Sequence, residues 1–157
     1  MSRPPESPGR PHLALVGLMG AGKSFVARGL AGCLNTRVLS SDVLRKELAG
    51  VPFTQPHHDP WGTGLYDEVS SEATYQELHR RAQAHLEAGR SVVLDASYRR
   101  REWREGARQV ARECGASFLA VECVAPEEVL HQRLDSRLQR RGVPSDGRWE
   151  IFHQQQQ

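Results

Sequence analysis

Hydrophobic and polar residues follow two alternating patterns along the chain. Short apolar runs are typical of buried strands, and they occur at 13–16, 37–40, 91–95 and 117–123. Apolar residues three or four positions apart predict amphipathic helices at 25–34, 43–49, 70–88, 102–114 and 126–138. Strands that alternate with helices predict an α/β fold, in which a parallel sheet carries helices on both faces.

Polar residues mark where two of these helices begin. Ser41 or Asp42 suits the N-cap of the helix after the second strand, and Ser70 or Ser71 suits that of the long third helix. The connector 51–68 is rich in Pro, Gly and His. Connectors of that length are usually functional or disordered, so it is predicted to be more than a link.

The two ends of the chain differ from its centre. Residues 1–11 lack the apolar core of a signal peptide and predict a disordered tail. The segment 140–147 predicts a mobile loop, and the sequence then runs into glutamines. A single domain is therefore expected over 12–157.

Composition narrows the classes of function. The 157 residues are 25% charged and 38% hydrophobic, which fits a globular protein. The formal net charge of +2 is too small to indicate nucleic acid by itself. No apolar run reaches membrane-spanning length, so a cytoplasmic protein without membrane partners is expected. Cys33, Cys114 and Cys123 lack metal-site spacing and predict buried, reduced thiols.

The most informative stretch is Gly17-Leu18-Met19-Gly20-Ala21-Gly22-Lys23-Ser24, between the first strand and the first helix. It fits the G-x-x-x-x-G-K-[ST] pattern of a phosphate-binding loop. Glycines let the backbone approach phosphates closely, and the N-terminus of the following helix favours negative charge. The pattern G-x-G-x-x-G fails because Phe25 occupies its third glycine position. A nucleoside triphosphate site is therefore predicted.

Each residue of this loop has an expected role. Lys23 would bind the β- and γ-phosphates of ATP, and the Ser24 hydroxyl would bind Mg²⁺. The residues expected to bind nucleotide are Gly17, Gly20, Ala21, Gly22, Lys23, Ser24, Phe25 and Arg133.

Two carboxylates follow strands, at the edge of a parallel sheet where ligands bind. Asp95 ends an apolar strand and would hold the magnesium shell; the alternative is a turn-forming aspartate. Asp42 would act as the general base toward an acceptor hydroxyl, and a simple helix-capping role is the alternative. Arg45, one turn later, would bind an anionic part of the acceptor.

Several basic and aromatic residues are candidates for the same cleft. Arg133 and Arg137 lie four apart and would neutralise charge in phosphoryl transfer, unless they form a solvated helix face. Arg104, near the basic run 99–101, is expected on the substrate side, although surface solvation explains it equally well. Tyr66 would stack on an acceptor or pack under its loop.

One further group in the connector, His57-His58-Asp59, has residue types of a metal site but no partner motif. It is interpreted as ordinary loop.

These motifs resemble those of the zeta-toxin-like P-loop kinases, in a branch usually labelled AAA-family ATPase. The resemblance rests on Gly17–Ser24, Ser41–Gly50, Thr74-Tyr75, Gly89–Tyr98, Arg104, Ala125–Leu130, Arg133-Leu134 and Ser145-Asp146. It implies a three-layer P-loop sandwich with strand order 2-3-1-4. It also implies that Asp42 is the base, as the matching aspartate is in chloramphenicol phosphotransferase and polynucleotide kinase. The chain departs from the family by ending before a fifth strand.

The sequence thus predicts an ATP- and Mg²⁺-dependent kinase that phosphorylates a hydroxyl of a small molecule. A polynucleotide 5′-hydroxyl kinase is an alternative that the weak net charge disfavours. A non-catalytic ATP-binding switch or interaction module is the other. The sequence leaves the acceptor and the oligomeric state open.

Overall fold

A computed structural model describes residues 11–17, 21–52 and 64–138. The strands are β1 (Pro11–Gly17), β2 (Arg37–Ser40), β3 (Val92–Asp95) and β4 (Ser117–Cys123). The helices are α1 (Lys23–Leu34), α2 (Ser41–Leu48), α3 (Glu68–Glu87), α4 (Arg101–Glu113) and α5 (Glu127–Leu138), with a short 3₁₀ turn, η1, at Gly64–Tyr66.

The strands form a parallel sheet in the order β2-β3-β1-β4, which confirms the predicted order. The register sets Asp95 of β3 level with Leu15 of β1 and with Ser40 of β2. On the other side of β1, Gly17 pairs with Cys123 of β4. All four strands therefore end at the same edge of the sheet.

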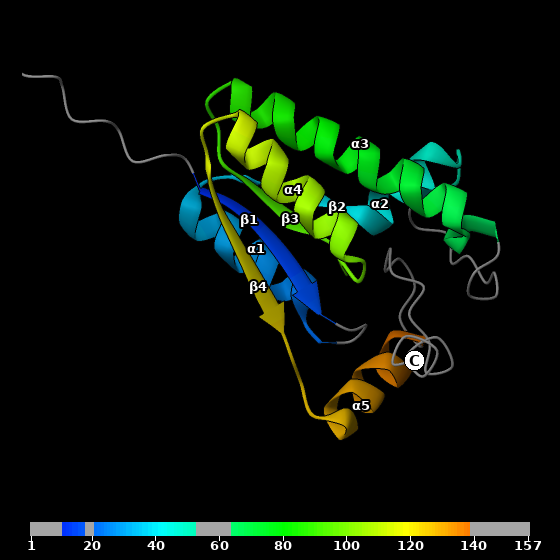
Figure 1. Cartoon of the computed structure of the whole chain (residues 1–157). Coiled ribbons are helices and arrows are strands. Elements are labelled where there is room, and N and C mark those ends of the chain that lie inside the picture. The colour runs from blue at the N-terminus through cyan, green and yellow to red at the C-terminus, as the bar shows by residue number, and fades with distance from the viewer. Residues whose placement is uncertain (1–10, 18–20, 53–63, 139–157) are drawn as a thin grey trace, which may run out of the picture.

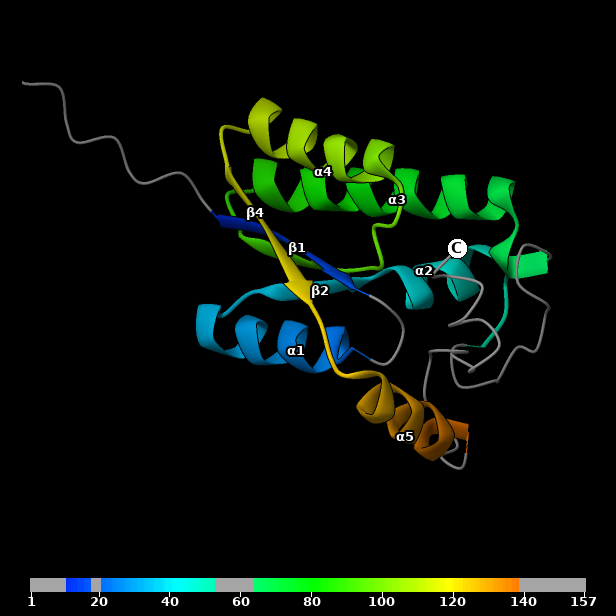
Figure 2. The same ribbon diagram turned by 60° about the horizontal axis from the view of Figure 1, so that its bottom comes forward.

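Helices cover both faces of the sheet, as predicted. Helices α3 and α4 pack on one face and α1 on the other, while α5 lies beyond the carboxyl end of β4 (Figures 1 and 2). The larger core cluster joins α3 and α4 to β3, and its buried members include Tyr75, Leu78, Val92, Leu94 and Ala107. A smaller cluster joins Ala27 of α1 to Val93. Alternate β3 side chains thus point to opposite layers.

The predicted N-caps of two helices are wrong. Helix α3 begins earlier than expected, because the Asp67 side chain caps it by accepting a hydrogen bond from the Ser70 amide (2.6 Å). Ser40 is the N-cap residue of α2, which moves Asp42 into the first turn. There its carboxylate lies at the positive end of the helix dipole, rather than serving as the cap itself.

The cysteines also differ from expectation. Cys33 is exposed, and Cys114 and Cys123 are only half-buried, although all three are free thiols as predicted. Cys33 lies in the last turn of α1, which ends in an exposed segment at Leu34 and Asn35. The helical spacing identified the apolar residues of α1 but not how far the core extends along it.

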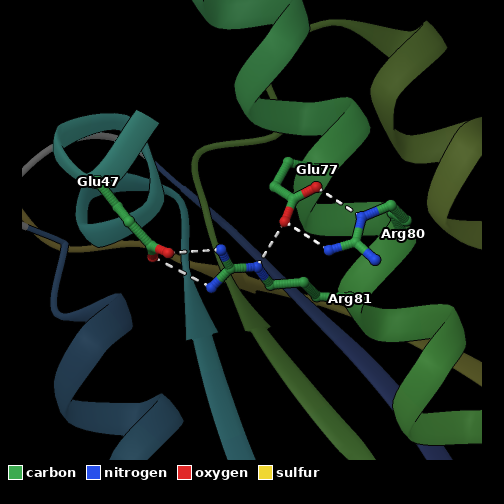
Figure 3. A network of polar contacts seen from close by, with 4 residues as sticks. All are labelled: Glu47, Glu77, Arg80 and Arg81. Carbon is green, nitrogen blue, oxygen red and sulfur yellow. Dashed lines mark hydrogen bonds and ion pairs between the residues drawn. The ribbon is translucent and has the colours of Figure 1, made fainter. Parts of the chain in front are cut away.

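An arginine bridges α2 and α3 (Figure 3). Arg81 of α3 donates to both carboxylate oxygens of Glu47 on α2 (2.7 and 3.1 Å) and to Glu77 on its own helix (2.7 Å). Hydrogen bonds from Arg80 and Arg81 lower the pKa of Glu77 to about 2. The contacts are solvent-exposed and worth little energy individually, but they join the far end of α2 to the middle of α3.

Two histidines, His12 of β1 and His79 of α3, have side chains that burial keeps from carrying a charge. His12 of β1 is fully buried, contacts Phe118 edge-on, and has no hydrogen-bond partner on either ring nitrogen within the described residues. Burial, with the nearby His79 charge, lowers the His12 pKa to about 4. Burial also lowers the pKa of His79 to about 4. Both rings are therefore neutral in the fold at neutral pH.

The fold is expected to lose stability as the pH falls from 6.5 toward 4. Over that range the histidines bind protons in the unfolded chain while the folded ones stay neutral, so protonation favours unfolding. A full difference of this size corresponds to about 3 kcal/mol for a completely buried ring such as His12. Urea denaturation at about pH 7.5 and about pH 5 measures the part of this loss in the free energy of unfolding that develops above pH 5.

The matched variant is His12→Leu, which removes two unpaired buried nitrogens. It should flatten the pH dependence and leave stability at neutral pH equal or higher. An unchanged pH slope in this variant would contradict the assignment to His12.

Candidate active site

The phosphate-binding loop enters α1 through a glycine in a left-handed conformation. Gly22 has φ of 94° and is the N-cap residue of α1, whose first turn contains no acidic residue. Helices α2, α3, α4 and α5 each carry an acidic residue in the first turn. Among the described helices, α1 is therefore the one whose N-terminal dipole has no carboxylate of its own helix beside it, an arrangement that favours binding of an anion. Ala21 is buried, whereas Phe25 is exposed; Gly20 lies outside the described residues.

Lys23 and Asp95 both affect the pKa of Cys123, the last residue of β4. Burial raises the pKa of the Cys123 thiol, the Lys23 charge lowers it, and the Asp95 charge raises it again. Asp95 is buried at the end of β3, and Lys23 and Ser24 occupy the first turn of α1. The lysine of the loop and the strand-end carboxylate are therefore both within electrostatic reach of the Cys123 thiol.

A close backbone contact fixes this edge. A Cβ atom at Gly17 would collide with the carbonyl oxygen of Cys123, so β1 and β4 approach one another more closely than any side chain allows. The glycine at the start of the motif is thus needed for strand packing as well as for the loop.

Helix α5 brings a cation to the loop. A Cβ atom at Gly22 would lie 3.3 Å from Nη1 of Arg133, which places that guanidinium directly against the start of α1. Arg133 is exposed. Arg137 belongs to the same helix, but its side chain lies outside the described residues.

A second group of residues surrounds the Tyr75 hydroxyl, on the α2 side of the site. Burial raises the pKa of this phenol; hydrogen bonds from Ser97 and Tyr98 and the Arg45 charge lower it, and the Asp42 charge raises it. Asp42 and Arg45 are therefore both within electrostatic reach of one buried hydroxyl. Arg99 belongs to the same group, since Tyr75 also affects its pKa, which burial lowers.

The loop after β3 is held by Tyr75 in an uncommon conformation. Tyr98 has φ of 45°, in the left-handed region that non-glycine residues seldom adopt. Its amide donates to the Tyr75 hydroxyl (3.0 Å), and its own hydroxyl contacts His79 Nε2 (3.3 Å). The Tyr75 hydroxyl also contacts the Ser97 hydroxyl (3.2 Å). The loop that follows Asp95 thus takes its shape from α3.

Arg104 serves the same loop. Its Nη1 donates to the carbonyl oxygens of Tyr98 (2.6 Å) and Arg99 (2.8 Å). Arg104, a predicted substrate residue, is thus hydrogen-bonded to the backbone of this loop. Tyr75 affects the pKa of its neighbour Arg99. Sequence reasoning missed Tyr75 and Ser97 as site-forming residues, although Tyr75 belongs to the motif that carried the family resemblance.

Tyr66 is close to Arg45. The Arg45 guanidinium carbon lies 4.9 Å from the centre of the Tyr66 ring, and both residues lie where η1 meets α2. These two residues, for which the sequence predicts separate roles, thus lie together.

Other candidate sites are either undescribed or not found. His57-His58-Asp59 lies outside the described residues. Within the described parts of the chain, no group of three or more His, Cys, Asp or Glu side chains could hold a metal ion. None of the described helices is long and apolar enough to cross a membrane.

Comparison with known proteins concerns the family of the chain and its fold. The family model AAA_33, described as "AAA domain", matches residues 13–157. An uncharacterized protein of Mycobacterium tuberculosis is 34% identical over 141 residues, which are 89% of this chain and 28% of that protein. The chain therefore spans less than a third of the length of that relative.

Two solved kinases share the fold. The APS kinase CysC of Mycobacterium tuberculosis, in complex with AMPPNP and APS, has a TM-score of 0.65 and 25% identity, over 85% of this chain and 73% of that one. A gluconokinase of Sinorhizobium meliloti has a TM-score of 0.60 and 19% identity, over 95% of this chain and 76% of that one. The α/β P-loop kinase fold predicted from the sequence is confirmed.

Tyr75→Phe is expected to destabilise the protein by about 1–3 kcal/mol, because the buried Tyr98 amide loses its acceptor. Chemical denaturation measures the change. Ser97→Ala is the control, since it removes a half-buried hydroxyl from the same contact but leaves the amide paired. Equal losses in the two variants would show that the Tyr98 amide is not the group held by Tyr75.

Proposed function

Because the chain belongs to the AAA_33 family of AAA domains, we propose that it is an ATP- and Mg²⁺-dependent kinase for a hydroxyl of a small molecule. The observation that carries the proposal is the arrangement at the sheet edge. Lys23 and Asp95 both lie within electrostatic reach of Cys123, and Asp42 lies in the first turn of α2, two residues after Ser40, which pairs with Asp95. A phosphate site and a separate carboxylate on the acceptor side are the parts that phosphoryl transfer needs.

The chain's residues suit a magnesium nucleotide. Asp95 and the Ser24 hydroxyl would supply oxygen ligands, and one or two such ligands with phosphate oxygens and water are what Mg²⁺ normally accepts. Bound there, the ion would neutralise charge on the β- and γ-phosphates. The residues that would hold the nucleotide are those of the loop and the first turn of α1: Gly17, Gly20, Ala21, Gly22, Lys23, Ser24 and Phe25.

Each remaining residue has one task in the transfer. Asp42 accepts the proton of the acceptor hydroxyl as that oxygen bonds to the γ-phosphorus, and the bond to the β-phosphate oxygen breaks to leave ADP. Arg133, against Gly22, offsets the charge on the transferring phosphoryl group; Arg137 follows on the same helix. Arg45 and Tyr66 contact the acceptor, and Arg104 positions the loop that carries Arg99.

The small size of the acceptor is supported by the kinase neighbours, one of which is solved with APS and the other of which is a gluconokinase. The closer relation to zeta-toxin-like kinases, chloramphenicol phosphotransferase and polynucleotide kinase stays a prediction. So do a cytoplasmic location and the division into a tail, 1–11, and a kinase domain, 12–157.

Neither alternative function is favoured by a particular observation. Transfer to nucleic acid would need a basic groove with stacking rings; in the described residues Trp103 instead stacks on Tyr75 (3.9 Å between centroids). A non-catalytic switch has no need of a carboxylate at position 42.

Asp42→Asn is expected to lower kcat by about 100-fold or more while ATP binds with unchanged affinity, because only the proton acceptor is lost. Acceptor-dependent ADP release and nucleotide titration measure the two quantities. Glu113→Gln, exposed at the end of α4, is the control and should keep full activity. Unaltered turnover in Asp42→Asn would leave a different base or a non-catalytic role.

Arg133→Gln is expected to lower kcat by about 100-fold with a much smaller effect on ATP affinity, because charge builds up mainly in the transition state. Single-turnover phosphoryl transfer gives the rate. Arg112→Gln, exposed near the end of α4, is the matched loss of an arginine. A loss confined to ATP affinity would instead make Arg133 a ground-state phosphate ligand.

A further inference from the structure

Strand β4 forms one edge of the sheet in the described part of the chain. It is the last strand in the order β2-β3-β1-β4, and its main contacts are with β1 and α4 (Figure 1). All seven residues of Ser117–Cys123 pair with β1 in unbroken register, so the strand is regular along its whole length. The outer side of such an edge strand presents backbone N–H and C=O groups with which another strand can pair.

β4 lacks the features that usually keep an edge strand from pairing. Its sequence, SFLAVEC, contains no Lys or Pro, and Glu122 is its one charged residue. Leu119, near the middle of the strand, is 56% exposed, and Ala120 beside it is exposed as well. The opposite edge of the sheet, β2, has only four residues and begins with an exposed arginine. The β4 edge is therefore the one that suits a partner strand.

The side chains of β4 point alternately to the two faces of the sheet. Phe118 packs against the core cluster under α3 and α4, and the guanidinium carbon of Arg108 lies 5.4 Å from the centre of its ring. Val121 packs against the smaller cluster on the α1 side. Leu119 therefore shares the α1 face with Val121, and Glu122 shares the α4 face with Phe118.

Two copies of β4, paired antiparallel about a two-fold axis at Ala120, would match apolar residues to one another. Leu119 of each copy would lie opposite Val121 of the other, on the α1 face. The exposed leucine would thus gain an apolar neighbour across the strands, the type of pair that stabilises a sheet.

The same pairing would match opposite charges on the α4 face. Glu122 of each copy would lie opposite Phe118 of the other, and so beside the Arg108 guanidinium that covers that ring. Within the described residues Glu122 forms no ion pair, and the ion pair of Arg108 with Glu105 is long (3.8 Å). The two-fold axis would produce this contact twice.

We propose that a second copy of this chain docks on β4, so that two four-stranded sheets join through an antiparallel β4–β4 pair. The carboxyl end of each β4 meets the amino end of the other, so the two candidate active sites lie at opposite ends of the joined strands. One pair of seven-residue strands is smaller than a standard interface, and the dimer is therefore weak and depends on concentration. This interaction surface does not depend on the proposed kinase function.

Sedimentation velocity of the full chain from about 1 to about 500 µM tests the association. The mass should rise with concentration from 17.6 kDa toward twice that value. Leu119→Lys puts a charge in the middle of the edge and should stay monomeric. Leu48→Lys, which replaces a leucine of similar exposure (51%) at the end of α2, should associate like the parent chain.

A parent chain that is monomeric at every concentration would overturn the proposal and leave this edge to a strand of another polypeptide. Association that Leu119→Lys leaves unchanged would place the interface elsewhere on the molecule. Circular dichroism of each variant shows that it is folded, which the exposure of both leucines leads us to expect.

A charge exchange tests the pairing across the two copies. Glu122→Arg and Arg108→Glu should each raise the dimer Kd about tenfold, because like charges then face one another across the strands. The double variant should return the Kd to about the parent value, since the opposite charges are restored. Additive losses in the double variant would contradict the register centred on Ala120.

An engineered cross-link tests the two-fold axis directly. Ala120→Cys, in a chain whose exposed Cys33 is replaced by Ser, sets two Cβ atoms about 5 Å apart, close to the separation that a disulfide requires. Mild oxidation should give covalent dimers. Ala88→Cys, also exposed, at the C-cap of α3, is the control and should give few. Equal yields from the two variants would count against the pairing.

Discussion

The register of β3 between β1 and β2 is the constraint on which the site depends. Parallel pairing sets Leu15, Asp95 and Ser40 side by side, so the loop after β1, the carboxylate ending β3 and the helix after β2 share one edge. A shift by a single residue would turn Asp95 to the other face of the sheet. Since Val92, Val93 and Leu94 are completely buried, such a shift would also disrupt both core layers. Apolar packing of β3 thus determines where the Asp95 carboxylate lies.

The site divides into two electrostatic regions. On the β1 and β4 side, Lys23 and Arg133 lie at the N-terminus of α1, and Lys23 and Asp95 both affect the pKa of Cys123. On the α2 and α3 side, Asp42 and Arg45 both lie within electrostatic reach of the buried Tyr75 hydroxyl. The sheet supplies the first region directly, whereas the second depends on how α2 is held against α3. The Glu47–Arg81–Glu77 contacts and the Arg45 bonds to Leu65 and Ser71 provide that hold.

Much of this was predictable because each feature is local in the sequence. The strand–loop–helix around Lys23 and the aspartates after β2 and β3 follow from apolar runs and one motif, and alternation predicted the parallel sheet. The strand order came from the family resemblance. The wrong prediction of the α3 N-cap reflects competition between nearby polar residues, because Asp67 takes the place expected for Ser70 or Ser71. The roles of Arg104, Tyr75 and Ser97 depend on contacts between distant segments, which periodicity does not encode. The exposure of Cys33 likewise depends on where the core ends.

The left-handed backbone at Tyr98 has a consequence for motion. Such a conformation costs about 1–3 kcal/mol and persists only while its surroundings enforce it. Here the enforcing groups are Tyr75 and His79 from α3 and Arg104 from α4. Fraying of α3 would therefore release the loop after β3 at the same time. The loop and the helix behave as a single cooperative unit of local unfolding, so their amide protons exchange with solvent together.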